Sequence, residues 1–162
     1  MPIQYTHLSS PIGSLLLVCD SAGLRQITST QDGRPGTPQP DWHEDESAFA
    51  EPIRQLRAYF AGELGNFDLL LAPEGTAFQQ KVWDELRNIP FGETISYGQL
   101  AKRIGNPNAS RAVGLANGSN PIPIVIPCHR VIGSNGKLTG YGGGLPIKEK
   151  LLALEKRQLR LV

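Results

Sequence analysis

A run of apolar residues that ends in a proline and a cysteine constrains this sequence most. Residues 120–132 read Asn-Pro-Ile-Pro-Ile-Val-Ile-Pro-Cys-His-Arg-Val-Ile. The β-branched residues 124–126 predict a buried strand, and Pro127 cannot donate to a sheet ladder, so regular pairing is expected to fail there. Cys128 would then lie at the frayed end of a buried strand, where a thiol nucleophile has access without general exposure. The alternative is a core cysteine beside a surface histidine.

A carboxylate within an apolar stripe is the second informative feature. Residues 145–159 predict a closing helix in which Glu155 shares a face with Ile147, Leu151 and Leu159. Burial of a carboxylate is costly unless it has a partner, and the imidazole of His129 is a suitable one. Adjacent residues of an extended chain point to opposite sides, so His129 is not expected to touch the Cys128 thiol. We therefore expect a relay from Glu155 through His129 and a water, which would draw the thiol toward thiolate. The alternatives are a solvent-exposed Glu155 and a His129 without a catalytic role.

Residues 1–72 are expected to form a small α/β domain. Its predicted strands are residues 3–6, 13–20, 23–28 and 68–71. An amphipathic helix is predicted from residues at helical spacing, which are Phe49, Ile53, Leu56, Tyr59 and Phe60. This part of the chain shows no chemistry of its own, so its expected role is support.

Residues 76–162 are expected to form a second, mostly helical domain. Two capping boxes predict helix starts, Thr76 with Gln79 and Ser96 with Gln99. After the second, a turn with Gly105 leads to a third helix from about residue 108, and two short helices joined in this way are typical of a helix-turn-helix. The third helix consists mainly of small residues, which favours close approach to DNA or close helix packing. Its charged residue is Arg111.

The charge of the chain is divided unevenly between its halves. Residues 1–75 contain 4 Lys and Arg against 10 Asp and Glu, whereas residues 76–162 contain 12 against 5. Phosphate neutralisation by basic side chains supplies most of the non-specific affinity for nucleic acid, so the second half is expected to face a polyanion. Mutual attraction of the two halves is the alternative.

Other features of the sequence bear on the cellular location of the protein and on metal binding. No apolar run approaches the roughly 20 residues that a membrane span needs, and the N-terminus lacks the pattern of a signal peptide, so a cytoplasmic protein is expected. A structural zinc is not expected, because Cys19 has only His7 and His43 nearby in the sequence. Cys19 is interpreted instead as a buried strand residue.

The motif around the cysteine resembles that of a known family. Pro-Cys-His-Arg-Val at residues 127–131, with Asn-Pro-Ile-Pro before it and the glycines of residues 140–144 after it, resembles the acceptor-cysteine motif of the O6-alkylguanine-DNA alkyltransferases. The resemblance is strong over residues 76–155 and weak before residue 71. It implies an α+β fold, in which a ribonuclease-H-like domain with an antiparallel sheet and a helix precedes a helical domain with a winged helix-turn-helix.

The resemblance also implies an activity. In that family the cysteine matching Cys128 takes an alkyl group from O6 of guanine in one irreversible transfer, without a methyl-donor cofactor. The acid and histidine matching Glu155 and His129 form the water-linked relay, and the asparagine matching Asn120 is a hinge that braces the active-site loop. The implied partner is double-stranded DNA that carries O6-alkylguanine, bound in the minor groove by a monomer. Activity on O4-alkylthymine and clustering of copies on DNA stay open.

Further residues are assigned to DNA and to the base by the same resemblance. The arginine matching Arg111 fills the space left by a flipped base, and Tyr97 and Asn106 lie against the DNA backbone. The guanine edge is held by the backbone of Cys128 and by three further residues, namely Val131 through its backbone, Ser134 and Tyr141.

Two other functions stay open on the sequence. A cysteine hydrolase or acyltransferase also combines a cysteine, a histidine and an acid, but it needs a base that reaches the thiol directly. A non-catalytic, lesion-binding helix-turn-helix protein is the other alternative. Relatives of that kind carry another residue in place of the cysteine, so Cys128 favours transfer.

Overall fold

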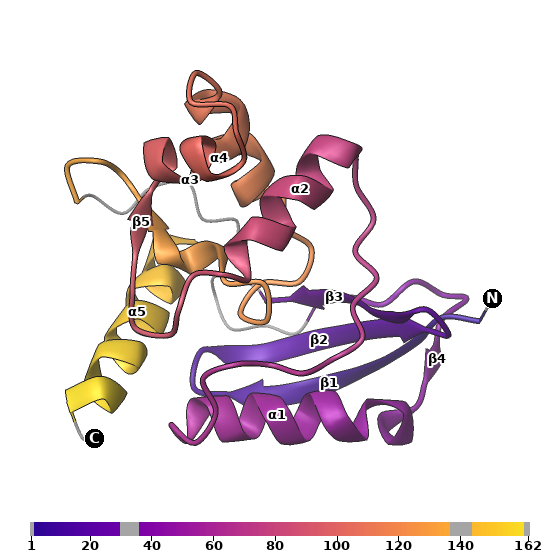
Figure 1. Ribbon diagram of the computed structural model, residues 1–162. Coiled ribbons are helices and arrows are strands. Elements are labelled where there is room, and N and C mark those ends of the chain that lie inside the picture. Colours follow the sequence, from indigo (N-terminus) through magenta and orange to yellow (C-terminus); the bar gives the residue numbers. More distant parts are fainter. Residues whose placement is uncertain (1, 30–35, 137–143, 161–162) are drawn as a thin grey trace.

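The N-terminal part of the protein is a four-stranded sheet with one helix packed along it. The computed structural model describes residues 2–29, 36–136 and 144–160. The strands are β1 (Gln4–Ser10), β2 (Gly13–Asp20), β3 (Gly23–Thr28) and β4 (His43–Glu44), in the spatial order β3-β2-β1-β4. A 3-10 turn η1 (Glu46–Phe49) leads into α1 (Ala50–Phe60), which lies along the sheet (Figure 1). Side chains of α1 that were predicted to face the core are buried there, namely Ile53, Leu56 and Tyr59.

The sheet differs from the prediction in three respects. Strand β1 continues to Ser10, beyond the predicted end at residue 6, because Leu8 is buried and pairs with Leu15. Residues 68–71 do not form a strand, and only Leu71 makes an isolated parallel bridge to β3. The sheet is also not purely antiparallel, because the short β4 pairs parallel with β1.

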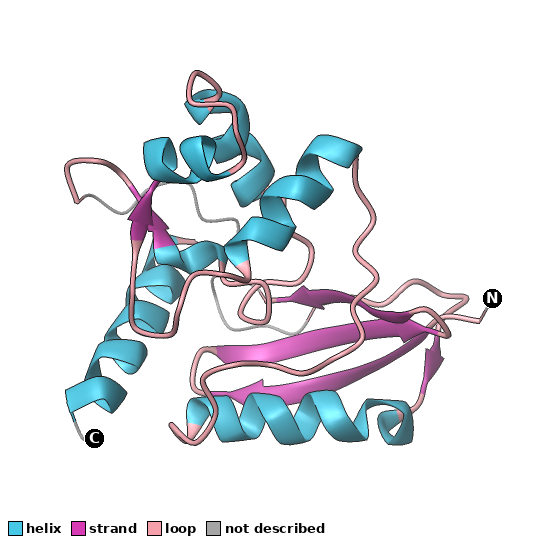
Figure 2. Ribbon diagram, viewed as in Figure 1, coloured by secondary structure: helices cyan, strands magenta, loops and turns pink. Residues whose placement is uncertain are grey.

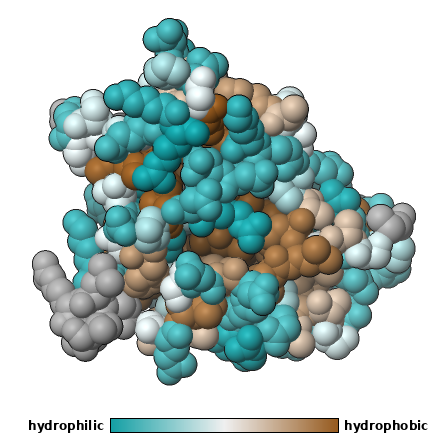
Figure 3. Space-filling view, viewed as in Figure 1, coloured by the Kyte–Doolittle hydropathy of each residue, from teal (hydrophilic) through white to brown (hydrophobic). Residues whose placement is uncertain are grey.

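The second half of the chain is mostly helical, as predicted (Figure 2). Its elements are α2 (Ala77–Leu86), β5 (Ile95–Ser96), α3 (Tyr97–Arg103), α4 (Ser110–Gly118), η2 (Cys128–Arg130), β6 (Val131–Ile132) and α5 (Leu145–Arg160). Both predicted capping boxes are present, at the starts of α2 and α3. In Figure 3, apolar side chains gather between this helical part and the sheet, while hydrophilic side chains cover most of the remaining face.

Helices α3 and α4 form the predicted helix-turn-helix. Gly105 in the turn has a φ of +81°, a conformation that favours glycine. The amide of Asn106 donates to the carbonyl of Ala101 at 3.0 Å and closes the turn. Helix α4 is fixed to α2 by a hydrogen bond from Trp83 Nε1 to the carbonyl of Ala116, 2.8 Å long. A rigid support therefore holds α4 at the surface.

The segment before the cysteine is a tight turn, and the predicted strand over residues 124–126 is wrong. Ile124 has a φ of +75°, and Pro123 and Ile126 face each other in an isolated bridge. The side chains of the apolar run are buried as expected. However, the three prolines of the segment lack amide hydrogens, so it cannot continue a sheet ladder and folds back on itself.

Within the described residues, no helix combines the length and the apolar character that a membrane crossing requires.

Candidate active site

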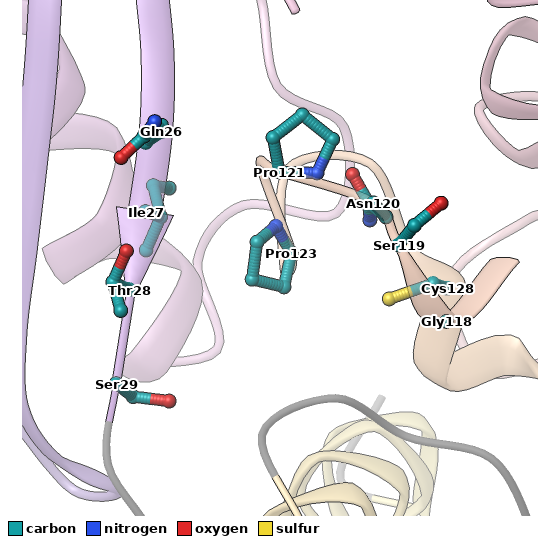
Figure 4. Close-up of a pocket in the computed structure, with 10 residues that line it drawn as sticks. All are labelled: Gln26, Ile27, Thr28, Ser29, Gly118, Ser119, Asn120, Pro121, Pro123 and Cys128. Atoms are coloured by element: carbon teal, nitrogen blue, oxygen red, sulfur yellow. The ribbon is translucent and has the colours of Figure 1, made fainter. Parts of the chain in front are cut away.

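Cys128 opens the 3-10 turn η2 and lies at the edge of a cavity. Its amide donates to the carbonyl of Ile126 at 2.8 Å, and its carbonyl accepts from Asn117 Nδ2 at 3.3 Å. The residue is only 4% exposed. In Figure 4 the sulfur points away from the turn and into the cavity. The thiol is therefore enclosed, but it faces an open space.

Asn120 holds the turn that carries the cysteine. Its Nδ2 donates to the carbonyl of Ile126 at 2.7 Å, and its Oδ1 accepts from the amide of Ile122 at 2.9 Å. Together these bonds span the residues around Ile124 and replace the ladder that the prolines exclude. The amide side chain also contacts the Cys128 thiol and opposes the rise in its pKa.

Glu155 lies at the centre of a buried polar network and is only 1% exposed, so the expectation of a partnered carboxylate is confirmed. Its Oε2 lies 2.6 Å from His129 Nε2. Arg130 donates from Nε to Oε1 at 2.9 Å and from Nη2 to Oε2 at 3.1 Å. The hydroxyl of Tyr59 donates to Oε2 at 2.6 Å, and the amide of Gly92 donates to Oε1 at 3.2 Å. The guanidinium balances the carboxylate charge.

The electrostatics of this network fix the state of the histidine. Burial alone would raise the pKa of Glu155, but hydrogen bonds and charge from His129 and Arg130 lower it to about 2. Burial lowers the pKa of His129 below its ordinary value, against the pull of Glu155. A neutral imidazole beside a carboxylate donates from Nε2, which leaves the Nδ1 lone pair free. No described residue hydrogen-bonds to Nδ1, which is buried.

The cysteine itself is held as a thiol in the resting protein. Burial raises the pKa of Cys128 to about 11, although the hydrogen bond from Asn120 and the charge of Lys148 oppose that rise. The resting structure therefore differs from the expectation of a thiol drawn toward thiolate. Deprotonation has to accompany the reaction.

Three contributors were missed from the sequence, namely Lys148, Tyr59 and Arg130 as a partner of Glu155. Lys148 of α5 is fully buried, and its Nζ donates to the carbonyl of Val131 at 2.6 Å. It lies seven residues before Glu155, two helical turns along the same face, and that spacing could have revealed it. Tyr59 was assigned to the core, and nothing in its helical spacing indicated that its hydroxyl reaches the second domain.

The residues expected to contact DNA lie on the helix-turn-helix. Arg111 is exposed in the first turn of α4, and Asn106 is exposed in the turn before it. Tyr97, the first residue of α3, is half-buried and lies beside Gly114 of α4. Leu115 is 73% exposed one turn after Arg111 and was not singled out from the sequence.

The described residues expected to hold the guanine base do not gather around the cavity that Cys128 faces. Val131 is buried in β6 beside the cysteine, and Ser134 is exposed in the turn that follows. Neither is among the described residues that line the cavity in Figure 4. Tyr141 lies outside the described residues. Cys19, by contrast, is buried in β2 as predicted, and its thiol donates to Gln4 Oε1 at 3.7 Å.

Replacement of Tyr59 by phenylalanine is expected to lower the free energy of unfolding by about 2 kcal/mol, because a buried carboxylate loses a hydrogen bond. Tyr5→Phe removes a hydroxyl from the sheet instead, away from Glu155, and is expected to cost less than about 0.5 kcal/mol. Urea unfolding of both variants measures the difference. Equal stabilities would mean that the hydroxyl does not support the carboxylate.

Comparison with known proteins shows the family of the chain. Residues 77–157 match the model of the 6-O-methylguanine DNA methyltransferase DNA binding domain, and residues 3–73 match that of the ribonuclease-like domain of the same proteins. The chain therefore belongs to the O6-methylguanine DNA methyltransferase family.

Individual relatives are similar over nearly their whole length. A methylated-DNA--protein-cysteine methyltransferase of Methanosarcina acetivorans is 59% identical over 94% of this chain and 98% of its own. The crystal structure of Mycobacterium tuberculosis O6-methylguanine methyltransferase has a TM-score of 0.88 at 50% identity, over 98% of both chains. The Mycobacterium tuberculosis OGT in complex with DNA also gives a TM-score of 0.88, at 52% identity over 96% of this chain and 94% of its own.

Proposed function

We propose that this protein repairs DNA by direct reversal, and that Cys128 takes the alkyl group from O6 of guanine in double-stranded DNA. Relatives that are 50% identical or more are methylated-DNA--protein-cysteine methyltransferases, and one solved relative is bound to DNA. The observation that carries the proposal is a thiol that faces a cavity beside a buried histidine with an unused nitrogen.

The transfer consumes one thiol for each lesion. The sulfur of Cys128 attacks the alkyl carbon, a carbon–sulfur bond forms, and the bond from that carbon to O6 breaks with its electron pair left on the base. The thiol proton leaves the sulfur and one proton is taken up by the guanine, so the products are a neutral guanine and a thioether. All groups that we assign to these steps come from one chain, so a monomer is sufficient. A free thiol also fits the reducing cytoplasm.

We assign the proton of the thiol to His129. The Nε2 hydrogen is directed to Glu155 at 2.6 Å, which leaves Nδ1 as the acceptor. Nδ1 is not bonded to the sulfur, so a water is the natural link between the two. Asn120 keeps the turn closed while the sulfur reacts, and Lys148 contributes positive charge that favours the thiolate as it forms.

This relay predicts how the rate depends on pH. The reactive population has a neutral His129, whose pKa is lowered, and a protonated Cys128, whose pKa is about 11. That population is nearly constant between about pH 7 and about pH 9, so the rate of reaction with free O6-benzylguanine is expected to change less than about twofold. A rise of about tenfold for each pH unit would instead indicate simple ionisation of the thiol before attack.

We propose that the exposed face of α4 enters the minor groove and that Arg111 fills the space left by the flipped base. An alkylated base within a duplex is out of reach of a buried sulfur, and base flipping costs a few kcal/mol, part of which an inserted side chain offsets. Leu115 lies one turn from Arg111 and is 73% exposed, which suits contact with sugar edges. Tyr97 and Asn106 are assigned to the DNA backbone.

Arg111→Ala is expected to leave the rate of reaction with free O6-benzylguanine unchanged. It is expected to slow repair of a methylated duplex about tenfold or more, because no side chain then occupies the space that the flipped base leaves. Arg57→Ala removes an exposed arginine of α1 and is the matched control, with both rates unchanged. Single-turnover rates on the two substrates measure the effect. Equal losses on free base and duplex would contradict the assignment.

The residues that contact the guanine base are those that the sequence resemblance implies. The backbone at Cys128 and Val131 and the side chain of Ser134 are proposed to hold the guanine edge, together with Tyr141. Support for this assignment is the position of β6, which follows the 3-10 turn of the cysteine and is fixed by the buried Lys148.

One experiment distinguishes alkyl transfer from the two alternatives, a cysteine hydrolase or acyltransferase and a lesion-binding protein. A hydrolase requires a base in contact with the thiol, whereas Nδ1 of His129 makes no such bond, and a purely lesion-binding protein has no use for the thiol. Incubation with a duplex that carries O6-methylguanine, followed by peptide mass analysis, is expected to place one methyl group on Cys128. Repeated turnover, or a methyl group elsewhere, would refute the proposed function.

A further inference from the structure

The cavity that the Cys128 sulfur faces is shared by the two domains. Its volume is about 300 Å³, and one side is lined by residues 118–121, Pro123 and Cys128. The other side is formed by residues 26–29, which belong to β3 and the residue after it. Figure 4 shows Thr28 and Ser29 across the cavity from the sulfur, with the ring of Pro123 between the two sides. The N-terminal domain therefore forms one wall of the space at the reactive atom.

This wall is held in place by the fold. The amide of Ile27 donates to the carbonyl of Pro121 at 2.9 Å, so β3 is hydrogen-bonded to the loop that carries the cysteine. Side chains alternate along a strand, and Ile27 is buried while Thr28 is exposed on the other face. Thr28 and Ser29 both line the cavity, and in Figure 4 the hydroxyl of Ser29 extends from the strand toward it. A change at Thr28 therefore alters the cavity without entering the hydrophobic core.

We infer that Thr28 and Ser29 of the N-terminal domain limit the size of the alkyl group that Cys128 accepts, an inference that rests on the proposed function. In an in-line displacement the alkyl carbon lies between sulfur and O6, so its substituents extend sideways into the space around the sulfur. Cys128 is 4% exposed, and the cavity is the open space that it faces. Substituents on the carbon therefore extend into the cavity that Pro123 and the β3 wall line.

The dimensions of the cavity admit groups larger than methyl. A cavity of about 150 Å³ is enough to hold a benzene ring, and this one has about twice that volume. The rings of Pro121 and Pro123 offer apolar surface, whereas Thr28 and Ser29 offer hydroxyl groups at the rim. A benzyl group is thus expected to be accepted by the native protein, with its ring against the prolines.

The test compares two duplexes that differ in the alkyl group alone, one with O6-methylguanine and one with O6-benzylguanine at the same position. Thr28→Phe fills the cavity and is expected to reduce the ratio of benzyl to methyl transfer rates about tenfold or more. Thr28→Ala enlarges it and is expected to raise the ratio about twofold. Ser9→Phe places the same ring on an exposed position of β1 and is expected to leave the ratio unchanged.

The outcomes separate this inference from the function on which it rests. If the native protein modifies Cys128 with neither group, the proposed function fails. If the native protein reacts but neither variant at Thr28 changes the ratio of rates, the β3 wall does not select the alkyl group. Equal slowing of both transfers by Thr28→Phe also overturns the inference. If Thr28→Phe does not fold, the ratio for Thr28→Ala decides, with no change as the contrary result.

Discussion

Cys128→Ser is expected to leave a folded protein that transfers no detectable alkyl group to itself. A serine hydroxyl is a far weaker nucleophile than a thiol, and within the described part of the chain Nδ1 of His129 is not bonded to the side chain to activate it. Serine has nearly the shape of cysteine, so the free energy of unfolding is expected to change by about 1 kcal/mol. Peptide mass analysis after incubation with a methylated duplex measures the loss.

Cys19→Ser is the matched control for this experiment. Cys19 is also buried, but it lies in β2 and its thiol contacts Gln4. The control is expected to retain the full extent of transfer, at one alkyl group per molecule. If both serine variants reacted like the native chain, the acceptor would be a residue other than cysteine.

Glu155→Gln is expected to lower the free energy of unfolding by about 3 kcal/mol and to slow transfer. Removal of one partner of a buried ion pair leaves the other charge uncompensated, and here the guanidinium of Arg130 would remain buried without its anion. His129 would also lose the acceptor that fixes its tautomer. Urea unfolding and single-turnover rates measure the two effects. An unchanged stability would contradict the network as described.

The control for this variant lies on the same helix. Glu149 is exposed on α5, and Glu149→Gln is expected to change stability by less than about 0.5 kcal/mol. The dependence on pH gives a second measurement. The pKa of Glu155 is lowered from 4.5 to about 2, so its contribution is complete above about pH 4.5 and is lost as the pH falls toward about 2. Glu155→Gln is expected to lose stability less steeply over that range.

The sequence predicted those helices and turns that are determined by residues close to one another in the chain. The two capping boxes at Thr76 and Ser96 mark helix starts because they satisfy amide groups locally, whatever the helix packs against. The glycine turn at Gly105 and the apolar face of α1 are local in the same sense. The stripe around Glu155 identified a buried carboxylate because an acid among apolar residues is tolerated only when a partner offsets the cost of its burial.

The errors arose from turn chemistry within one segment and from contacts between distant parts of the chain. Residues 124–126 have strand propensity, but three prolines and the side chain of Asn120 convert them into a turn with Ile124 at positive φ. No periodicity indicates that Tyr59 reaches across to Glu155, because that hydrogen bond joins residues 96 positions apart. The β3 wall at Thr28 was hidden for the same reason. The N-terminal domain was expected only to support the second domain, yet it contributes a hydroxyl to the buried network and one side of the cavity.

The hydrogen bond from Tyr59 to Glu155 limits how freely such domains can be exchanged. A chimera that joins the second half of this chain to a foreign N-terminal partner would inherit the cysteine, the histidine and the acid, but it would lack the hydroxyl donor. Transplanted halves are therefore expected to lose about 2 kcal/mol of stability unless the incoming helix offers a tyrosine at the matching depth.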